Sequence, residues 1–114
     1  MKIDKEYLSP DGDLRFIVRF QEGDWTLGFD GTPSHTHGDI LASEYGLPPD
    51  EAVLAYVQKL IGNELTIAVA TVGGKIRDIW VTDDPAQDLS YCPPNEDIEF
   101  RLWNKAKSHP GAFV

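Results

Sequence analysis

The sequence lacks long hydrophobic runs and has a single cysteine, Cys92. A membrane-spanning helix needs about 20 consecutive apolar residues, and no segment approaches that length. The first six residues carry several charges and no apolar core, so we do not expect them to act as a secretory leader. One cysteine cannot form a disulfide within the chain, which is typical of proteins in reducing compartments. We therefore expect a soluble, cytoplasmic protein with no membrane partner.

Clusters of basic residues are also missing. The chain has 10 Lys and Arg against 19 Asp and Glu, which gives a formal net charge of −9 and an isoelectric point near 4.5. Nucleic acids are polyanions, and proteins that bind them usually carry clustered Lys and Arg. We therefore expect no direct binding of nucleic acid. The excess of acid instead favours a basic partner, because opposite net charges attract at long range.

Common enzyme motifs are absent as well. The sequence has no Gly-x-Ser-x-Gly nucleophile elbow and no phosphate-binding P-loop. Gly73 and Gly74 lie between two strand-like segments, where they predict a hairpin turn rather than a nucleotide cradle. The acids near Cys92 should raise the pKa of its thiol, which disfavours a nucleophilic role. A non-catalytic protein is therefore favoured over an enzyme.

The chain does contain enough apolar residues for a core. Its 114 residues are 41% hydrophobic and 11% aromatic, which suits one domain that folds without disulfides or metal. Alternating apolar and polar residues predict strands at 14–20 and 25–29, after a short strand at 3–8. Turn-forming residues separate these strands. The first third of the chain is thus expected to form a three-stranded antiparallel meander.

Two helices are predicted in the middle of the chain, at 39–45 and 50–62. The second helix follows two prolines, has acids in its first turn and ends at Gly62, as helix termini prefer. Its apolar residues recur at helical spacing and form one stripe: Val53, Tyr56, Val57, Leu60 and Ile61. We expect this stripe to pack against the sheet.

Three more strands are predicted at 65–72, 75–82 and 97–103, with a long acidic loop at 83–96. The resulting order is βββ-α-α-βββ. It predicts an α+β domain with a mainly antiparallel sheet, or two such sheets, and the helices packed on one face. This single domain is expected to cover residues 1–103, and residues 104–114 are expected to form a loosely ordered tail.

Chemically versatile side chains are most concentrated at 35–39, which reads His-Thr-His-Gly-Asp. On an extended backbone His35, His37 and Asp39 would point the same way, and imidazole and carboxylate groups bind zinc. His35 and His37 are therefore candidate zinc ligands, with His109 or an acid of the 83–96 loop completing the site. The alternatives are that Asp39 caps the short helix, that the histidines bond to loop backbone, or that the cluster binds a partner.

A second candidate site is the acidic stretch 78–99, which holds seven acids and neither Lys nor Arg. Asp83, Asp84 and Asp88 lie closest together, and paired carboxylates can share a proton or hold a cation. Their spacing does not match a calcium loop of the EF-hand type. A solvated surface turn is one interpretation. An acidic protein-binding surface is the other, because long loops are often functional.

Trp103 is a candidate interface anchor. It falls out of phase with the inward-facing residues of the strand at 97–103, so we expect it at the surface, where tryptophan often anchors a partner. Trp25 and Trp80 are expected in the core. Tyr91, near a pair of prolines in the acidic loop, offers a second anchor.

These observations favour a small acidic protein-binding module. A specific version is an inhibitor or immunity-type protein that blocks a basic partner such as a toxin. Two alternatives stay open: a small metal-binding protein or metal-dependent enzyme built on the histidine cluster, and a structural domain that forms a homodimer or larger homo-oligomer. Elemental analysis for zinc distinguishes the protein-binding module from the metal-binding alternative. The candidate binding residues are His35, His37, Asp39, Asp83, Asp84, Asp88 and Trp103.

Overall fold

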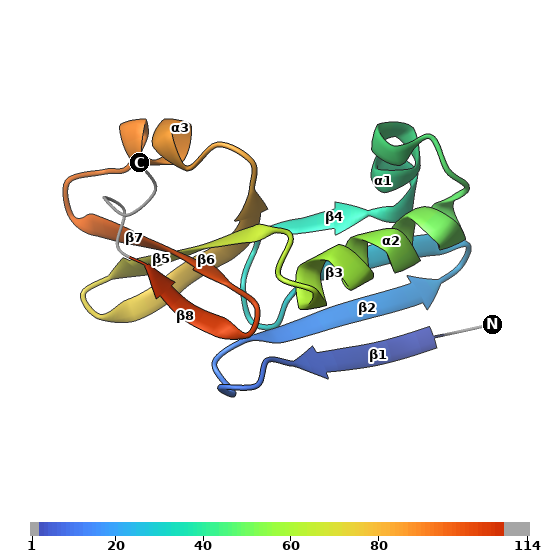
Figure 1. Ribbon diagram of the computed structural model, residues 1–114, viewed down its shortest axis with the longest axis horizontal. Helices are drawn as coiled ribbons and strands as arrows, with labels where there is room; N and C mark the ends of the chain where they lie inside the picture. The colour runs from blue at the N-terminus through green and yellow to red at the C-terminus, as the bar shows by residue number, and fades with distance from the viewer. Residues whose placement is uncertain (1–2, 109–114) are drawn as a thin grey trace.

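The computed structural model describes residues 3–108, which form two antiparallel sheets lying side by side along the long axis of the molecule (Figure 1). We call the sheet of the first four strands sheet A and that of the last four strands sheet B. Helices lie between the two sets of strands in the chain and again within the second set. The predicted α+β class is therefore confirmed, and the strands form two sheets rather than one.

Sheet A contains, in hydrogen-bonded order, β1 (Ile3–Leu8), β2 (Arg15–Gln21), β3 (Asp24–Phe29) and β4 (His35–His37). Its first three strands form the predicted meander. Glu22 and Gly23 make the turn between β2 and β3, and both have the positive φ, 55° and 80°, that a two-residue hairpin turn of matching twist needs. The strand β4 was not predicted, because three residues carry too short a pattern.

The helices α1 (Gly38–Tyr45) and α2 (Pro49–Ile61) pack on one face of sheet A, as expected (Figure 1). The chain leaves α1 at Gly46, whose φ of 66° lies in the left-handed region that glycine adopts without strain. With 13 residues, α2 is the longest helix in the described part of the chain, and none of the described helices has the length and apolarity needed to cross a membrane.

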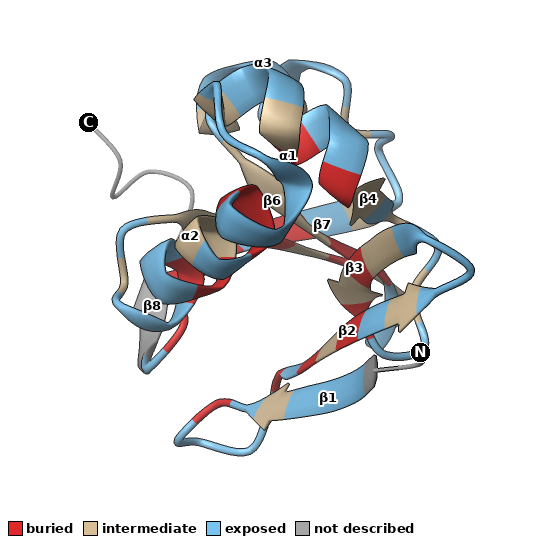
Figure 2. Cartoon of the chain, turned by 90° about the vertical axis from the view of Figure 1, so that its right-hand side faces the viewer, coloured by how far each residue is buried: buried red, intermediate tan, exposed pale blue. Residues whose placement is uncertain are grey.

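The buried side of α2 faces β2 and β3 (Figure 2). Val53, Val57 and Leu60 of the predicted stripe are buried and Tyr56 is half-buried, but Ile61 is 40% exposed. Ile61 is the last residue of α2 and lies at the margin of the apolar stripe. Its inclusion among the buried residues of the stripe was therefore wrong. The larger core that forms here joins both sheets, with these buried members: Leu14, Phe16, Val18, Leu27, Phe29, Leu41, Ala52, Val53, Val57, Leu60, Ile67, Ile79 and Trp103.

Sheet B contains β5 (Thr66–Val72), β6 (Lys75–Thr82), β7 (Glu96–Leu102) and β8 (Lys105–Ser108) in the order β6-β5-β7-β8. Alternate residues of its strands point to opposite faces. One face contributes to the larger core. The other carries a smaller apolar cluster, made of Ala68, Ala70, Ile98 and Phe100, with Trp80 and Cys92 packed against it.

Two parts of the chain differ from the sequence-based expectation. The acidic loop contains a short helix, α3 (Pro85–Ser90), which begins where the Asp84 carboxylate accepts a hydrogen bond from the Gln87 N–H at 3.1 Å. The expected tail at 104–114 is also wrong in part, because Lys105–Ser108 form β8 against β7. These four residues lack an apolar pattern that would have revealed a strand. Residues 109–114, with the candidate ligand His109, lie outside the described part.

An arginine links the two sheets. Arg101 of β7 is 7% exposed, and its guanidinium donates to Asp11 Oδ2 at 2.7 Å and to the carbonyl oxygen of Trp103 at 2.9 Å. Asp11 lies in the turn between β1 and β2, where it also accepts from the Ser9 hydroxyl at 2.6 Å. The Ser9 hydrogen bond, with the Asp13 N–H and Arg101, lowers the pKa of Asp11 below its ordinary value.

Asp11→Asn is expected to lower the free energy of unfolding at neutral pH by at most about 1 kcal/mol, because the Asp11 side chain is 32% exposed and water screens its ion pair. Since the folded-state pKa lies below the unfolded value of about 3.9, the carboxylate stabilises the fold above that pH. Its contribution is lost as the pH falls through the folded-state pKa. Urea denaturation of both proteins across pH should show a constant difference near neutrality that narrows in acid. A difference that does not change down to about pH 2 contradicts this assignment.

Candidate functional site

The two histidines of the 35–39 segment lie together on β4. Their rings meet edge to face with centroids 5.0 Å apart, as expected for alternate residues of an extended strand. His35 Nδ1 lies 3.0 Å from the Pro33 carbonyl oxygen, and His37 Nδ1 lies 3.4 Å from an oxygen of Asp24. Both imidazoles thus have polar neighbours within sheet A and its loops.

Asp39 does not continue this face, because the chain turns into α1 at Gly38. It lies inside the first helical turn, and the residue at the N-cap is His37, so the alternative in which Asp39 is the helix cap was wrong. In residues 3–108, no group of three or more His, Cys, Asp and Glu side chains is arranged to hold a metal ion. The zinc hypothesis for His35 and His37 stays a prediction.

The seven acids of the 78–99 stretch do not form one surface. Asp78 is buried between the sheets, Asp84 caps α3, and Glu96 pairs with Arg77. The other four do not gather on one surface. Asp97 and Glu99 alternate with Ile98 and Phe100 along β7, so they point to the sheet face opposite the smaller apolar cluster, whereas Asp83 and Asp88 line two different hollows.

Trp103 is not a surface anchor. It is 4% exposed and belongs to the larger core, so its predicted exposure was wrong. The strand β7 ends at Leu102, and Trp103 lies in the turn toward β8. The alternation of a strand therefore no longer fixes the direction of this side chain.

A concave site lies on the face of sheet B that carries the smaller apolar cluster. It is an open hollow of about 520 Å³, and we call it the Trp80 hollow. Residues of β6, α3, β7 and the connection before β7 line it: Arg77, Trp80, Asp88, Tyr91, Cys92, Pro93, Glu96 and Ile98. The strands and α3 bring together residues from both ends of the segment 77–98, which the sequence analysis described only by its acidic residues.

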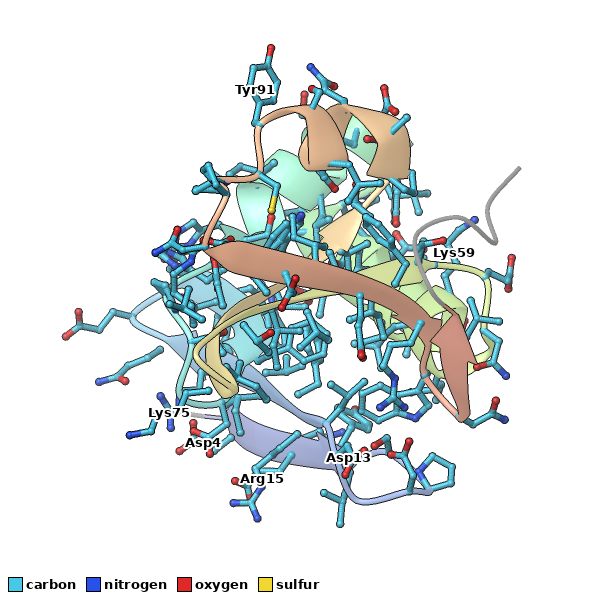
Figure 3. The ribbon with its side chains drawn as sticks, turned by 90° about the vertical axis from the view of Figure 1, so that its left-hand side faces the viewer. Asp4, Asp13, Arg15, Lys59, Lys75 and Tyr91 are labelled. Carbon is cyan, nitrogen blue, oxygen red and sulfur yellow. The ribbon has the colours of Figure 1, made fainter. Side chains whose placement is uncertain are left out.

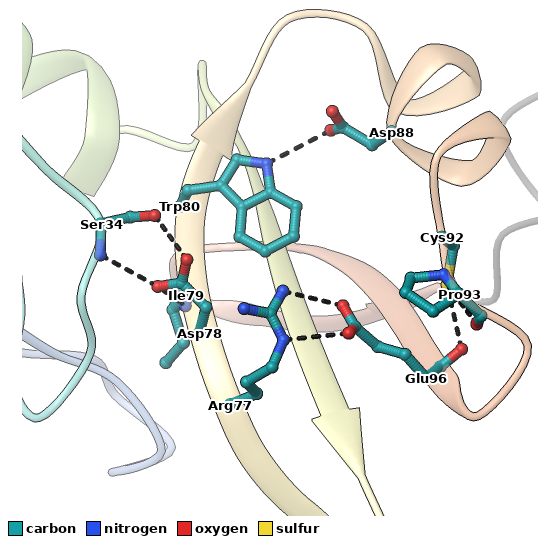
Figure 4. Close-up of polar contacts among 9 residues, drawn as sticks. All are labelled: Ser34, Arg77, Asp78, Ile79, Trp80, Asp88, Cys92, Pro93 and Glu96. Carbon is teal, nitrogen blue, oxygen red and sulfur yellow. Dashed lines mark hydrogen bonds and ion pairs between the residues drawn. The ribbon is translucent and has the colours of Figure 1, made fainter.

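Trp80 forms one wall of the hollow and is held in place by α3. Its indole Nε1–H donates to Asp88 Oδ2 at 3.3 Å (Figure 4). Its ring packs on the smaller apolar cluster. The sequence analysis expected Trp80 in the core, whereas it is half-buried. The sequence pattern could not show that the face of sheet B on which Trp80 lies is only partly covered.

An ion pair closes the opposite side of the hollow. Arg77 Nε and Nη2 donate to the two oxygens of Glu96 at 2.9 and 2.8 Å, a forked geometry that fixes both side chains (Figure 4). The Glu96 side chain is 7% exposed. Arg77 lies just before the acidic stretch, so its role as a counter-charge was missed by counting charges only within residues 78–99.

Cys92 lies beside this pair with its thiol directed at backbone. The Cys92 Sγ–H donates to the Glu96 carbonyl oxygen at 2.9 Å. Burial, followed by the nearby carboxylates of Glu96 and Asp97, raises the pKa of the thiol. The predicted direction of this pKa shift is confirmed, and it keeps the sulfur protonated at neutral pH.

Tyr91 stands at the rim of the hollow. Its side chain is 77% exposed and points away from the ribbon (Figure 3). Large exposed aromatic side chains at the edge of a depression are typical anchors of protein interfaces. The structure therefore places the tyrosine of the acidic loop where a partner could contact it.

A second hollow, of about 440 Å³, lies between the helices and the end of β6, where Asp83 faces Tyr45, Tyr56 and Lys59. Burial raises the pKa of the Tyr56 hydroxyl, and neighbouring Tyr45 and Glu44 raise it further. Its hydroxyl therefore stays protonated near neutral pH. Asp83 and Asp88 thus line two different hollows, although they are only five positions apart in the sequence.

Taken together, the Trp80 hollow offers an aromatic wall, an exposed tyrosine, a carboxylate and an internally paired arginine within one depression. Within this set the Cys92 thiol is protonated near neutral pH, and the Arg77 guanidinium is already paired with Glu96. Comparisons of this chain with protein-family models, with curated proteins and with solved structures give no match.

Proposed function

We propose that this chain is a small acidic protein-binding module that blocks a basic protein partner, in the manner of an inhibitor or immunity protein. The observation that carries the proposal is the Trp80 hollow, a depression with aromatic side chains and a carboxylate on a molecule whose net charge is −9. Interfaces of this kind combine a buried aromatic anchor with polar groups around it.

The charge of the molecule supports a basic partner. Asp83, Asp97 and Glu99 are exposed, and their carboxylates have no side-chain partner among residues 3–108. Asp97 and Glu99 share one face of sheet B, whereas Asp83 lines a hollow elsewhere, so their attraction does not come from a single acidic face. Such a field speeds the encounter of opposite charges and is weakened by salt.

The exposed side chain of Tyr91 supports the Trp80 hollow as the surface that contacts the partner. Tyr91 is the most exposed of the large hydrophobic residues that the structure describes, and Leu89, two positions earlier on α3, is 36% exposed. An apolar contact of this kind gives affinity, whereas the distant charges mainly give rate.

The proposal is tested on the partner that crosslinking captures from native lysate. Replacing Asp83 and Asp97 with Asn and Glu99 with Gln should slow association at least several-fold at low salt, because the attracting charge falls by three. The dissociation rate should change less, since these residues lie outside the hollow. Each replacement should change the free energy of unfolding by no more than about 0.5 kcal/mol.

A second variant provides a control in the opposite direction. Replacing Lys59 and Lys75 with Gln makes the molecule more acidic and should speed association with the same partner. Surface plasmon resonance at two ionic strengths separates the association and dissociation rates. An acidic partner, or association rates that ignore salt and both sets of substitutions, would reject the proposed function.

A further inference from the structure

We propose that the Trp80 hollow receives one cationic side chain, Lys or Arg, of the basic partner. This inference rests on the proposed function and names the group that the hollow recognises. The cation would lie against the Trp80 ring with its charge toward Asp88. Three features of the hollow support it.

The first feature is the state of the indole. The Trp80 Nε1–H already donates to Asp88 Oδ2 at 3.3 Å, so it is not available to hold the carbonyl group of a peptide. The ring itself lines the hollow, and the negative potential of an aromatic π-face attracts cations. A half-buried tryptophan in this setting therefore favours a positively charged ligand over a neutral backbone.

The second feature is the free oxygen of Asp88. Its Oδ2 accepts from Trp80, whereas no described residue donates to its Oδ1. The residue is set in α3, whose first turn is fixed by the Asp84 cap, so the carboxylate is held before a ligand arrives. A Lys or Arg head group that meets Oδ1 would form a charge-assisted hydrogen bond at little ordering cost.

The third feature is the neutralised arginine. Arg77 is the basic residue that lines the hollow, and its forked pair with Glu96 offsets its charge and takes up Nε and Nη2. The positive charge of Arg77 is therefore offset by Glu96 and repels an incoming cation only weakly. An incoming anion would meet Asp88 while Arg77 is already engaged, so anionic groups are disfavoured.

The test uses two tripeptides, acetyl-Gly-Arg-Gly-amide and the same peptide with citrulline, which keeps the shape of arginine but removes its charge. Each is titrated into the isotopically labelled full chain while the indole N–H signal of Trp80 is followed by NMR. The loss of one signal in Trp80→Phe assigns it. We expect a saturable shift with the arginine peptide and none with the citrulline peptide.

Two variants with the same charge change locate the binding. Asp88→Asn keeps an oxygen for the indole N–H but removes the charge, and it should weaken the arginine peptide about five- to tenfold. Asp83→Asn, in the other hollow, should change the dissociation constant by less than about twofold. Thermal melts of both variants check that the fold is kept.

Equal shifts with both peptides would show recognition of a neutral segment and reject the cation. Equal weakening by Asp83→Asn and Asp88→Asn would show only general charge attraction and reject the hollow as the site. Neither result depends on the natural partner. If the captured partner binds with the expected salt dependence while the tripeptide fails, the proposed function stands and this inference falls.

Discussion

Replacing Leu60 with alanine is expected to lower the free energy of unfolding by about 2–5 kcal/mol. Leu60 is fully buried at 0% exposure and belongs to the core that α2 shares with both sheets. Truncation removes apolar contacts and leaves a cavity that the neighbouring strands can fill only in part. The measurement is urea or thermal denaturation of the wild type and the variant.

Leu54→Ala on the same helix is the matched control. Leu54 is 58% exposed, so the same chemical change should cost no more than about 0.5 kcal/mol. The two substitutions have the same helix propensity effect, and their difference therefore reports burial alone. If both variants unfold alike, the buried side of α2 has been assigned wrongly.

Local patterns predicted the parts of the fold that depend on local physics. The stripe on α2 arises from the 3.6-residue repeat, and the alternation in β2 arises from the pleat, so each could be inferred from a short window of sequence. The end of α1 at Gly46 was predictable for the same reason, because a single residue supplies the left-handed conformation. These elements need no knowledge of what they pack against.

The candidate site could not be predicted in this way, because distant pairings build it. Arg77 and Glu96 are 19 positions apart, and they meet because β6 and β7 flank the same strand, β5. Trp80 and Asp88 meet through a short helix whose only local signals are a cap and a proline. The sequence named Asp88 and Tyr91 as candidates but could not show that Trp80 lies beside them.

The acidic stretch shows why composition is a weak guide to a surface. Along β7 the acids at 97 and 99 point away from the hollow, while Glu96 points into an ion pair. A strand divides neighbouring charges between its two faces, and a cap or a buried hydrogen bond uses others. Only a three-dimensional arrangement distinguishes an acid that holds the fold from one that faces solvent.

Among the acids of the 78–99 stretch, we expect the replacement of Asp78 to lower the free energy of unfolding most. It is 7% exposed, and its Oδ1 accepts from the backbone N–H groups of Ser34 and Ile79 at 3.1 and 2.8 Å, while its Oδ2 accepts from the Ser34 hydroxyl (Figure 4). Ser34 precedes β4 in sheet A and Asp78 lies in β6 of sheet B. One carboxylate therefore joins the two sheets.

Asp78→Ala is expected to lower the free energy of unfolding by about 2–4 kcal/mol, because it leaves two backbone donors and a hydroxyl without their acceptor in a largely buried place. Asp83→Ala, an exposed acid of the same stretch, should cost no more than about 0.5 kcal/mol. A double-mutant cycle of Asp78→Ala with Ser34→Ala isolates the hydrogen bond between the Ser34 hydroxyl and the Asp78 carboxylate, because each single variant removes one partner of that bond. A loss with Asp78→Ala no larger than that with Asp83→Ala would mean that Asp78 is solvated like its neighbours and does not help to hold the two sheets together.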